Sequence, residues 1–233
     1  MNMRATRART ALALVLGGAA SLLATTANAA DPVSIQLGVA SEYLGKGVAK
    51  SNEEPSVSGS VEVTRGGFFA SVFASTAELS SGADAEILTT IGYRAEFAGT
   101  GVDVMVINRD LPGTRTGGDG NYTEYQTDIS RKLGPIATRF RVNYTADGYG
   151  GTQEAWWVEM QGGIALDRST KLSAAIADRA ADGGAEYVAW NLGVKRKLND
   201  SFAVDLRYYD TDGAGQYGDA YDGRIVAALT FSL

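Results

Sequence analysis

Apolar and polar residues alternate with a period of two along most of the chain after Asp31. In residues 33–40 the odd positions are Val33, Ile35, Leu37 and Val39, whereas the even positions are polar or small. Such alternation predicts β-strands with one apolar face. The pattern returns in residues 57–63, 87–97, 136–144, 156–161, 172–179, 188–195, 202–209 and 221–233. With less regular runs near Phe69, Val104 and Glu124, the sequence predicts about twelve strands.

The connections between these runs alternate in length and composition. Short turns are expected at residues 65–67, 99–101, 133–135, 167–169 and 199–201. Longer loops rich in glycine and aspartate are expected at residues 45–54, 80–84, 110–120, 147–152, 180–184 and 212–220. Short turns at one end and longer loops at the other are typical of an up-and-down β-barrel in an outer membrane.

The first residues follow the pattern of a signal peptide. Three arginines precede an apolar run at residues 11–24, and the small-residue stretch Ala27-Asn28-Ala29 follows it. The rival interpretation is a membrane-anchoring helix, but the run is shorter than the ~20 residues such a helix needs. We therefore expect a signal peptide at residues 1–29, cleaved after Ala29, and a barrel at residues 30–233.

The length of the mature chain fits strands that cross a membrane. Removing 29 of 233 residues leaves 204, so each of about twelve strands has roughly seventeen residues including its connection, while a tilted membrane strand needs ~9 to 11. Lipid offers no partner for backbone amides, so the sheet must close without free edges. The predicted fold is all-β, a transmembrane antiparallel up-and-down barrel, with apolar faces toward lipid and polar faces toward a lumen.

Composition limits the possible chemistry. The 21 Lys and Arg against 27 Asp and Glu give a net charge of −6, and loss of the three arginines before the cleavage site makes the chain more acidic. Nucleic acid is therefore not an expected partner. The chain has no cysteine and no histidine, so it lacks disulfides and the commonest general base and metal ligand. We expect no enzyme, no catalytic residue, no cofactor and no metal site.

Aromatic residues near the predicted strand ends are candidates for the girdles that mark membrane interfaces. The alternative for any one of them is ordinary β-propensity. These residues are Tyr43, Tyr93, Phe97, Trp156, Tyr208 and Tyr221.

Charged residues of both signs fall on the polar faces of the predicted strands. The predicted lumen-lining residues are Glu62, Arg94, Glu96, Glu124, Arg139, Arg141, Glu159, Asp205 and Arg207, together with Glu86, Asp103 and Lys171 on the same faces. In one interpretation they line a narrow solute path and set its charge selectivity. In the other they pair into a salt-bridged plug that holds the barrel shut.

The chain resembles the proteobacterial TorF-type porins, conserved proteins of unknown function, over nearly all of its mature length. The matching stretches, in order, are residues 41–48, 54–57, 68–75, 111–113, 121–125, 187–190 and 208–212. The first reads Ser41-Glu42-Tyr43-Leu44-Gly45-Lys46-Gly47-Val48 and is followed by Glu54-Pro55-Ser56-Val57. The resemblance implies an outer-membrane location and a pore role, with no catalytic residues.

The function we expect is that of an outer-membrane porin or channel for small polar solutes in a Gram-negative bacterium. Its expected partners are outer-membrane lipid, lipopolysaccharide, the barrel-assembly machinery and such solutes. The alternatives are a plugged structural or surface-binding barrel, an outer-membrane barrel enzyme and a soluble secreted β-sandwich. Asp210-Thr211-Asp212-Gly213 has the start of a calcium loop, but no glutamate follows at the position that closes an EF-hand.

Overall fold

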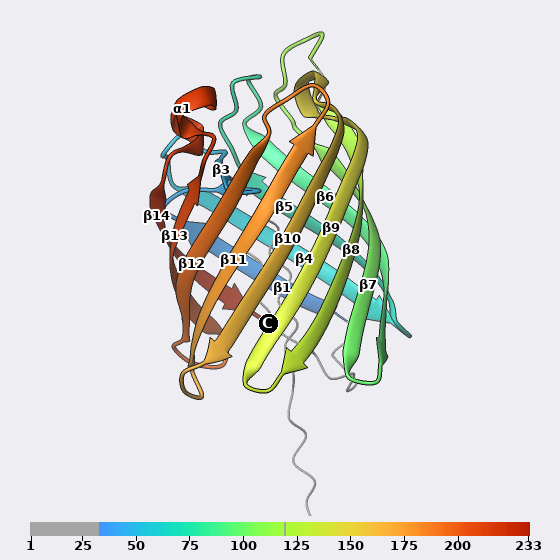
Figure 1. Ribbon diagram of the computed structural model, residues 1–233, viewed down its shortest axis with the longest axis vertical. Coiled ribbons are helices and arrows are strands. Elements are labelled where there is room, and N and C mark those ends of the chain that lie inside the picture. Colours follow the sequence, from blue (N-terminus) through green and yellow to red (C-terminus); the bar gives the residue numbers. More distant parts are fainter. Residues whose placement is uncertain (1–32, 119) are drawn as a thin grey trace, which may run out of the picture.

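Twelve antiparallel strands form a closed barrel in the computed structural model (Figure 1). The structure describes residues 33–118 and 120–233, so the predicted signal peptide lies outside the described residues. The prediction of about twelve strands is confirmed. The barrel strands are β1 (Val33–Ala40), β4 (Ser56–Arg65), β5 (Phe68–Thr76), β6 (Ala85–Phe97), β7 (Thr100–Asp110), β8 (Asn121–Leu133), β9 (Ile136–Gly148), β10 (Gln153–Ala165), β11 (Thr170–Ala181), β12 (Tyr187–Lys197), β13 (Phe202–Thr211) and β14 (Arg224–Ser232).

The first and last strands close the sheet. β1 pairs with β14, with Leu37 opposite Phe231 and Val39 opposite Leu229. On its other side β1 pairs with β4, and from β4 to β14 each barrel strand pairs with the next. Every barrel strand therefore has two hydrogen-bonded neighbours, as a barrel surrounded by lipid requires.

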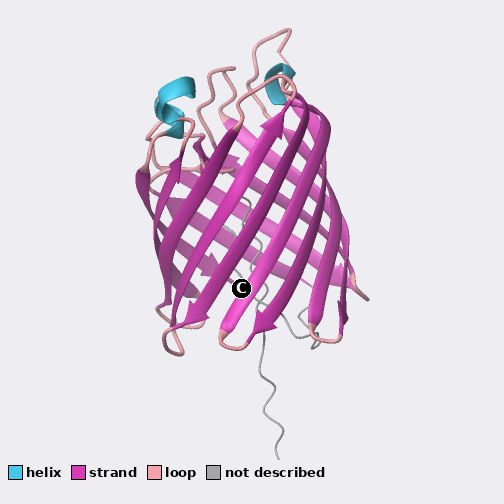
Figure 2. Cartoon of the chain, viewed as in Figure 1, coloured by secondary structure: helices cyan, strands magenta, loops and turns pink. Residues whose placement is uncertain are grey.

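The two ends of the barrel differ. One end carries only short turns, which we call the turn end, and the other carries longer excursions, which we call the loop end (Figure 2). The loop end also holds three short helices: η1 (Tyr149–Gly151), α1 (Ala214–Tyr217) and η2 (Asp219–Tyr221). None of the helices within residues 33–118 and 120–233 is long and apolar enough to cross a membrane.

Side chains at the turn end organise the reversals of the chain. The Asp167 carboxylate accepts hydrogen bonds from the backbone amides of Ser169 and Thr170, at 2.6 and 2.7 Å. Asn199 does the same for Ser201 and Phe202 in the next turn, at 2.9 and 2.8 Å. Such turns are a common use of Asp and Asn. The hydrogen bonds also lower the pKa of the Asp167 carboxyl, because they favour its charged form.

The exterior of the barrel is apolar and the interior is polar. Ile91 and Leu206 are 66 and 59% exposed on the outer surface, whereas Glu86 and Glu124 are fully buried inside. A soluble protein buries its apolar residues and exposes its charges. This barrel does the opposite, so the alternative of a soluble sandwich, in which the apolar faces meet in one core, is wrong.

Four of the six aromatic residues expected near strand ends lie on the outer surface. Tyr93 and Phe97 are exposed toward the turn end of β6, while Trp156 and Tyr208 are exposed toward the loop end. These positions fit interfacial girdles.

The prediction was wrong for the other two aromatic residues. Tyr43 is buried, because β1 ends at Ala40 and the chain turns into the barrel before it. Tyr221 lies in η2, before β14 begins, and its ring packs edge-on against that of Tyr187 at 5.1 Å between centroids.

Candidate functional site

The segment between β1 and β4, residues 41–55, folds into the barrel. We call it the inward loop; it contains the short strands β2 (Leu44–Gly45) and β3 (Val48–Ala49). The sequence predicted an outward loop at residues 45–54, and that prediction was wrong. The reason lies in its contacts: Tyr43 and Leu44 are only 7 and 6% exposed because they pack on the barrel interior.

The inward loop crosses the lumen and reaches the wall formed by β10 to β12. Val48 packs against the cluster that contains Trp157 and Tyr187, and the Tyr187 hydroxyl donates a 2.9 Å hydrogen bond to the Lys46 carbonyl. At Gly47, with φ of +81°, an added Cβ would lie 2.7 Å from the Cβ of Ala189. Only glycine meets both the conformation and the close approach at this position.

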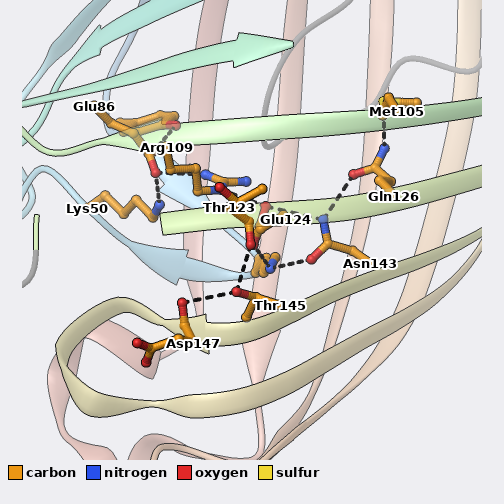
Figure 3. Close-up of polar contacts among 12 residues, drawn as sticks. Lys50, Glu86, Met105, Arg109, Thr123, Glu124, Gln126, Asn143, Thr145 and Asp147 are labelled. Carbon is orange, nitrogen blue, oxygen red and sulfur yellow. Dashed lines mark hydrogen bonds and ion pairs between the residues drawn. The ribbon is translucent and has the colours of Figure 1, made fainter. Parts of the chain in front are cut away.

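Five charged side chains of alternating sign attach the loop to the wall near the loop end, and Figure 3 labels Lys50, Glu86, Arg109 and Glu124 among them. Lys50 Nζ lies 2.7 Å from Glu86, and Arg109 Nη1 lies 2.7 Å from the same carboxylate. Arg109 Nε lies 2.6 Å from Glu124, which also pairs with Lys46. The chain of contacts, which we call the charge chain, thus runs Lys50, Glu86, Arg109, Glu124, Lys46.

Burial makes the charge chain energetically important. Both carboxylates are fully buried, and a buried ion is tolerated only when it is paired and hydrogen-bonded. Asn143 adds to this network, since it accepts a 2.9 Å hydrogen bond from Lys46 and donates one of 3.2 Å to Glu124. If the loop left the lumen, Arg109 alone would remain to pair with Glu86 and Glu124.

Further ion pairs lie on the interior wall closer to the turn end. Three of them join neighbouring strands, one links β4 to β6 past β5, and one lies along a single strand, so they stiffen the wall rather than cross the lumen. These pairs are Arg94 with Asp103 (2.9 Å) and Glu62 (3.5 Å), Arg139 with Glu159 (2.5 Å) and Arg141 with Asp128 (2.6 Å), and Arg207 pairs with Asp205 (3.2 Å) along β13.

The structure places the predicted lumen residues in two groups. Eight of the nine belong to ion pairs: Glu62, Arg94, Glu124, Arg139, Arg141, Glu159, Asp205 and Arg207. Glu96 is exposed at the turn end of β6, and it takes part in no ion pair within the described part of the chain. The sequence did not identify Lys46, Lys50 and Arg109 as interior residues. The apolar pair Tyr43-Leu44, which lies beside the expected outward loop, was a feature that could have indicated a loop directed into the barrel.

Two cavities border the inward loop. The first has about 680 Å³ of empty volume and is lined by loop residues and by Asn143, Arg141 and Glu159. The second has about 740 Å³ and lies against β1, β4, β5, β13 and β14. Tyr43 and Tyr209 line both cavities. The loop therefore narrows the interior and leaves these two spaces beside it.

A sequence profile of bacterial proteins of unknown function, the Gcw_chp family, matches residues 24–231. The chain belongs to the Gcw_chp family. No curated protein matches this Gcw_chp chain. Because the family's description assigns no activity, the function has to be inferred from the structure of the barrel.

Solved structures of similar shape include outer-membrane porins and channels. The KdgM porin superposes with a TM-score of 0.58 at 8% identity, covering 86% of this chain and 99% of that one. The NanC porin gives 0.52 at 9%, covering 86 and 97%. The COG4313 outer membrane channel from Pseudomonas putida F1 gives 0.51 at 11%, covering 86 and 93%. At these identities the likeness of the Gcw_chp chain to them is one of fold.

Proposed function

We propose that this protein is a TorF-type outer-membrane channel of a Gram-negative bacterium that passes small polar solutes. The observation that carries the proposal is the inverted distribution of side chains: an apolar exterior surrounds a charged interior that contains cavities. An apolar exterior matches lipid, and a polar, hydrated interior is what a solute path requires.

The proposal includes a route to the membrane. The chain is exported by a signal peptide cleaved after Ala29 and is inserted by the barrel-assembly machinery, with outer-membrane lipid and lipopolysaccharide around it. The turn end faces the periplasm and the loop end faces outward, as in other barrels with short turns and long loops.

The size of the solutes follows from the inward loop. A barrel of this strand number is wider than the eight-stranded barrels that side chains fill, and much narrower than a large porin. The inward loop takes up part of this space near the outer end. We therefore expect passage of small polar solutes and exclusion of larger ones.

Liposome swelling tests this proposal. Vesicles that contain the refolded protein should swell quickly in isotonic arabinose, which crosses protein-free bilayers only slowly, and slowly or not at all in a trisaccharide. A heat-modifiable shift in gel migration on the same sample shows that the barrel is folded. A folded barrel whose vesicles swell in arabinose no faster than protein-free vesicles would contradict the channel.

A plugged, non-conducting barrel is the second candidate, and the charge chain favours it. Five charges fix the inward loop across the lumen. In that case the barrel would serve as a scaffold or a surface-binding protein.

If the barrel spans a membrane, a charged residue on its outer surface should destabilise it more near the middle of the bilayer than near the interface. Leu206 in the middle of β13 and Leu198 in the adjacent turn are 59 and 56% exposed. We expect Leu206→Arg to destabilise the barrel by roughly 2–4 kcal/mol and Leu198→Arg by about 0–1 kcal/mol, because the cost of arginine falls toward the interface. Urea unfolding in lipid vesicles measures both values. Equal effects of the two substitutions would argue against a bilayer around β13.

A further inference from the structure

Charged residues that face outward on the barrel strands separate by sign. Arg65, Arg131 and Arg196 lie at the turn ends of β4, β8 and β12. Each lies two positions after an exposed apolar residue of its strand, and residues two apart share a face of the sheet. Within the described residues, the other outward-facing charges on strands are all acidic and lie toward the loop end: Asp110, Glu154, Asp178 and Asp210.

The three arginines, which we call the arginine rim, are not neutralised by the protein. All three are exposed, and none forms an ion pair within the described part of the chain. The adjoining turns add Arg168 and two carboxylates, Asp167 and Asp200. Asp167 is close enough to interact with Arg196, but its carboxylate is already bound by two backbone amides. The rim therefore keeps guanidinium donors for a partner outside the chain.

Hydroxyl groups lie in the same outward rows as two of the rim arginines. Arg131 Nη1 donates a 3.1 Å hydrogen bond to Thr100 Oγ1 on the neighbouring strand. Arg65 is the cross-strand partner of Phe68, and Tyr93 follows in the next strand with its ring edge-on to Phe68 at 4.9 Å between centroids. A guanidinium with a hydroxyl in the same row presents the donors that a phosphate group accepts.

Large apolar side chains surround the arginine rim. Phe68 pairs with Arg65, while Leu133 and Leu198 come two positions after the other two rim arginines. These apolar side chains are 65, 56 and 56% exposed. Exposed apolar surface beside a phosphate-binding cation suits a ligand in which hydrocarbon chains are attached to the phosphate. A free phosphate ion would gain nothing from that surface.

We infer that the arginine rim is a docking surface for anionic phospholipids in the leaflet around the turn end. The guanidinium groups bind the phosphate of the headgroup, and the neighbouring apolar side chains contact the acyl chains. Basic residues at a membrane surface attract anionic lipids, and salt screens the attraction. The outward carboxylates of the loop end would repel the same lipids. The inference rests on the membrane location in the proposed function and not on conductance.

Spin-labelled lipids measure this selectivity. The protein is refolded into phosphatidylcholine bilayers that contain a trace of spin-labelled phosphatidylglycerol or phosphatidylcholine. Electron paramagnetic resonance then gives the fraction of label held at the protein surface. At low salt we expect phosphatidylglycerol to associate about twofold or more better than phosphatidylcholine. Salt at about 1 M should remove most of this difference, because the Debye length falls to about 3 Å.

Two variants assign the preference to the rim. The arginine variant combines Arg65→Gln, Arg131→Gln and Arg196→Gln, and it should associate with both lipids nearly equally. The lysine variant combines Lys132→Gln and Lys197→Gln, which remove charges from lumen-facing positions at the same end, and it should keep the preference. Heat-modifiable migration shows that each variant is folded, and the salt series on the unaltered protein tests the electrostatic origin without any substitution.

The outcomes separate the docking surface from the channel. Equal association of the two lipids at low salt, or a preference that the arginine variant keeps, would overturn the docking surface and leave the channel in place. A preference that the lysine variant also loses would assign it to the total charge of the turn end and would likewise overturn the surface. Selective association by a barrel that does not conduct would refute the channel and support the surface. A chain that does not enter the bilayer would refute the membrane location on which both rest.

Discussion

Shortening the inward loop will raise the single-channel conductance by about twofold or more, because the loop occupies part of a modest barrel interior. The change replaces residues 44–53 with an Asn-Gly turn between β1 and β4. It removes Lys46 and Lys50 from the lumen, and with them the backbone that reaches Tyr187 and Ala189. Planar-bilayer recordings measure the effect.

A second shortened loop provides the control. Gly150 and Gly151 lie in η1 at the loop end, and among the described residues only their immediate chain neighbours can lie within 4 Å of a Cβ built at either position. Deleting both glycines should leave the conductance unchanged. A loop-shortened barrel that folds, yet conducts no more than the original protein, would show that residues 44–53 do not restrict the path.

Replacing Glu124 with alanine is expected to destabilise the barrel by roughly 3–5 kcal/mol, the usual cost of removing one partner from a buried ion pair. Glu124 is fully buried and pairs with both Lys46 and Arg109. Its loss leaves these cations short of a carboxylate in a space largely closed to water. Urea unfolding, followed by heat-modifiable migration, measures the free energy of unfolding.

Glu96 supplies the matched comparison for this substitution. It is exposed at the turn end of β6, and surface substitutions usually change stability by less than about 0.5 kcal/mol. Glu96→Ala should therefore be close to neutral. Similar effects at the two positions would mean that the charge chain does not hold the inward loop.

The barrel itself was predictable from the sequence because the pattern that produces it involves residues that are close together in the chain. Alternation of apolar and polar residues places each side chain outside or inside wherever the period of two is clear, as in β1 and β13. Connection length then separates the two ends. Closure follows from the need to pair every backbone amide in lipid.

The inward loop was not predictable, because its direction depends on residues far away in the sequence. Gly45, Lys46 and Gly47 have the composition of a surface loop, and their contacts are with Glu124, Tyr187 and other distant residues. Local sequence patterns carry no information about such contacts.

Arg109 was missed for a different reason. In β7 the outward positions are apolar, but the inward positions Met105 and Ile107 are apolar as well. The alternation is therefore weak in this strand, and the register that would place Arg109 inside is hard to recognise. Its inward position becomes evident only from its pairing with Glu86 and Glu124.

We propose that this barrel conducts through a lumen that the inward loop narrows. The most direct test is the single-channel conductance of the refolded protein in planar bilayers, recorded beside the loop-shortened variant. We predict small discrete steps for the protein and larger steps for the variant. A folded protein that shows no steps would contradict the account, and steps that appear only in the variant would favour a barrel plugged by the inward loop.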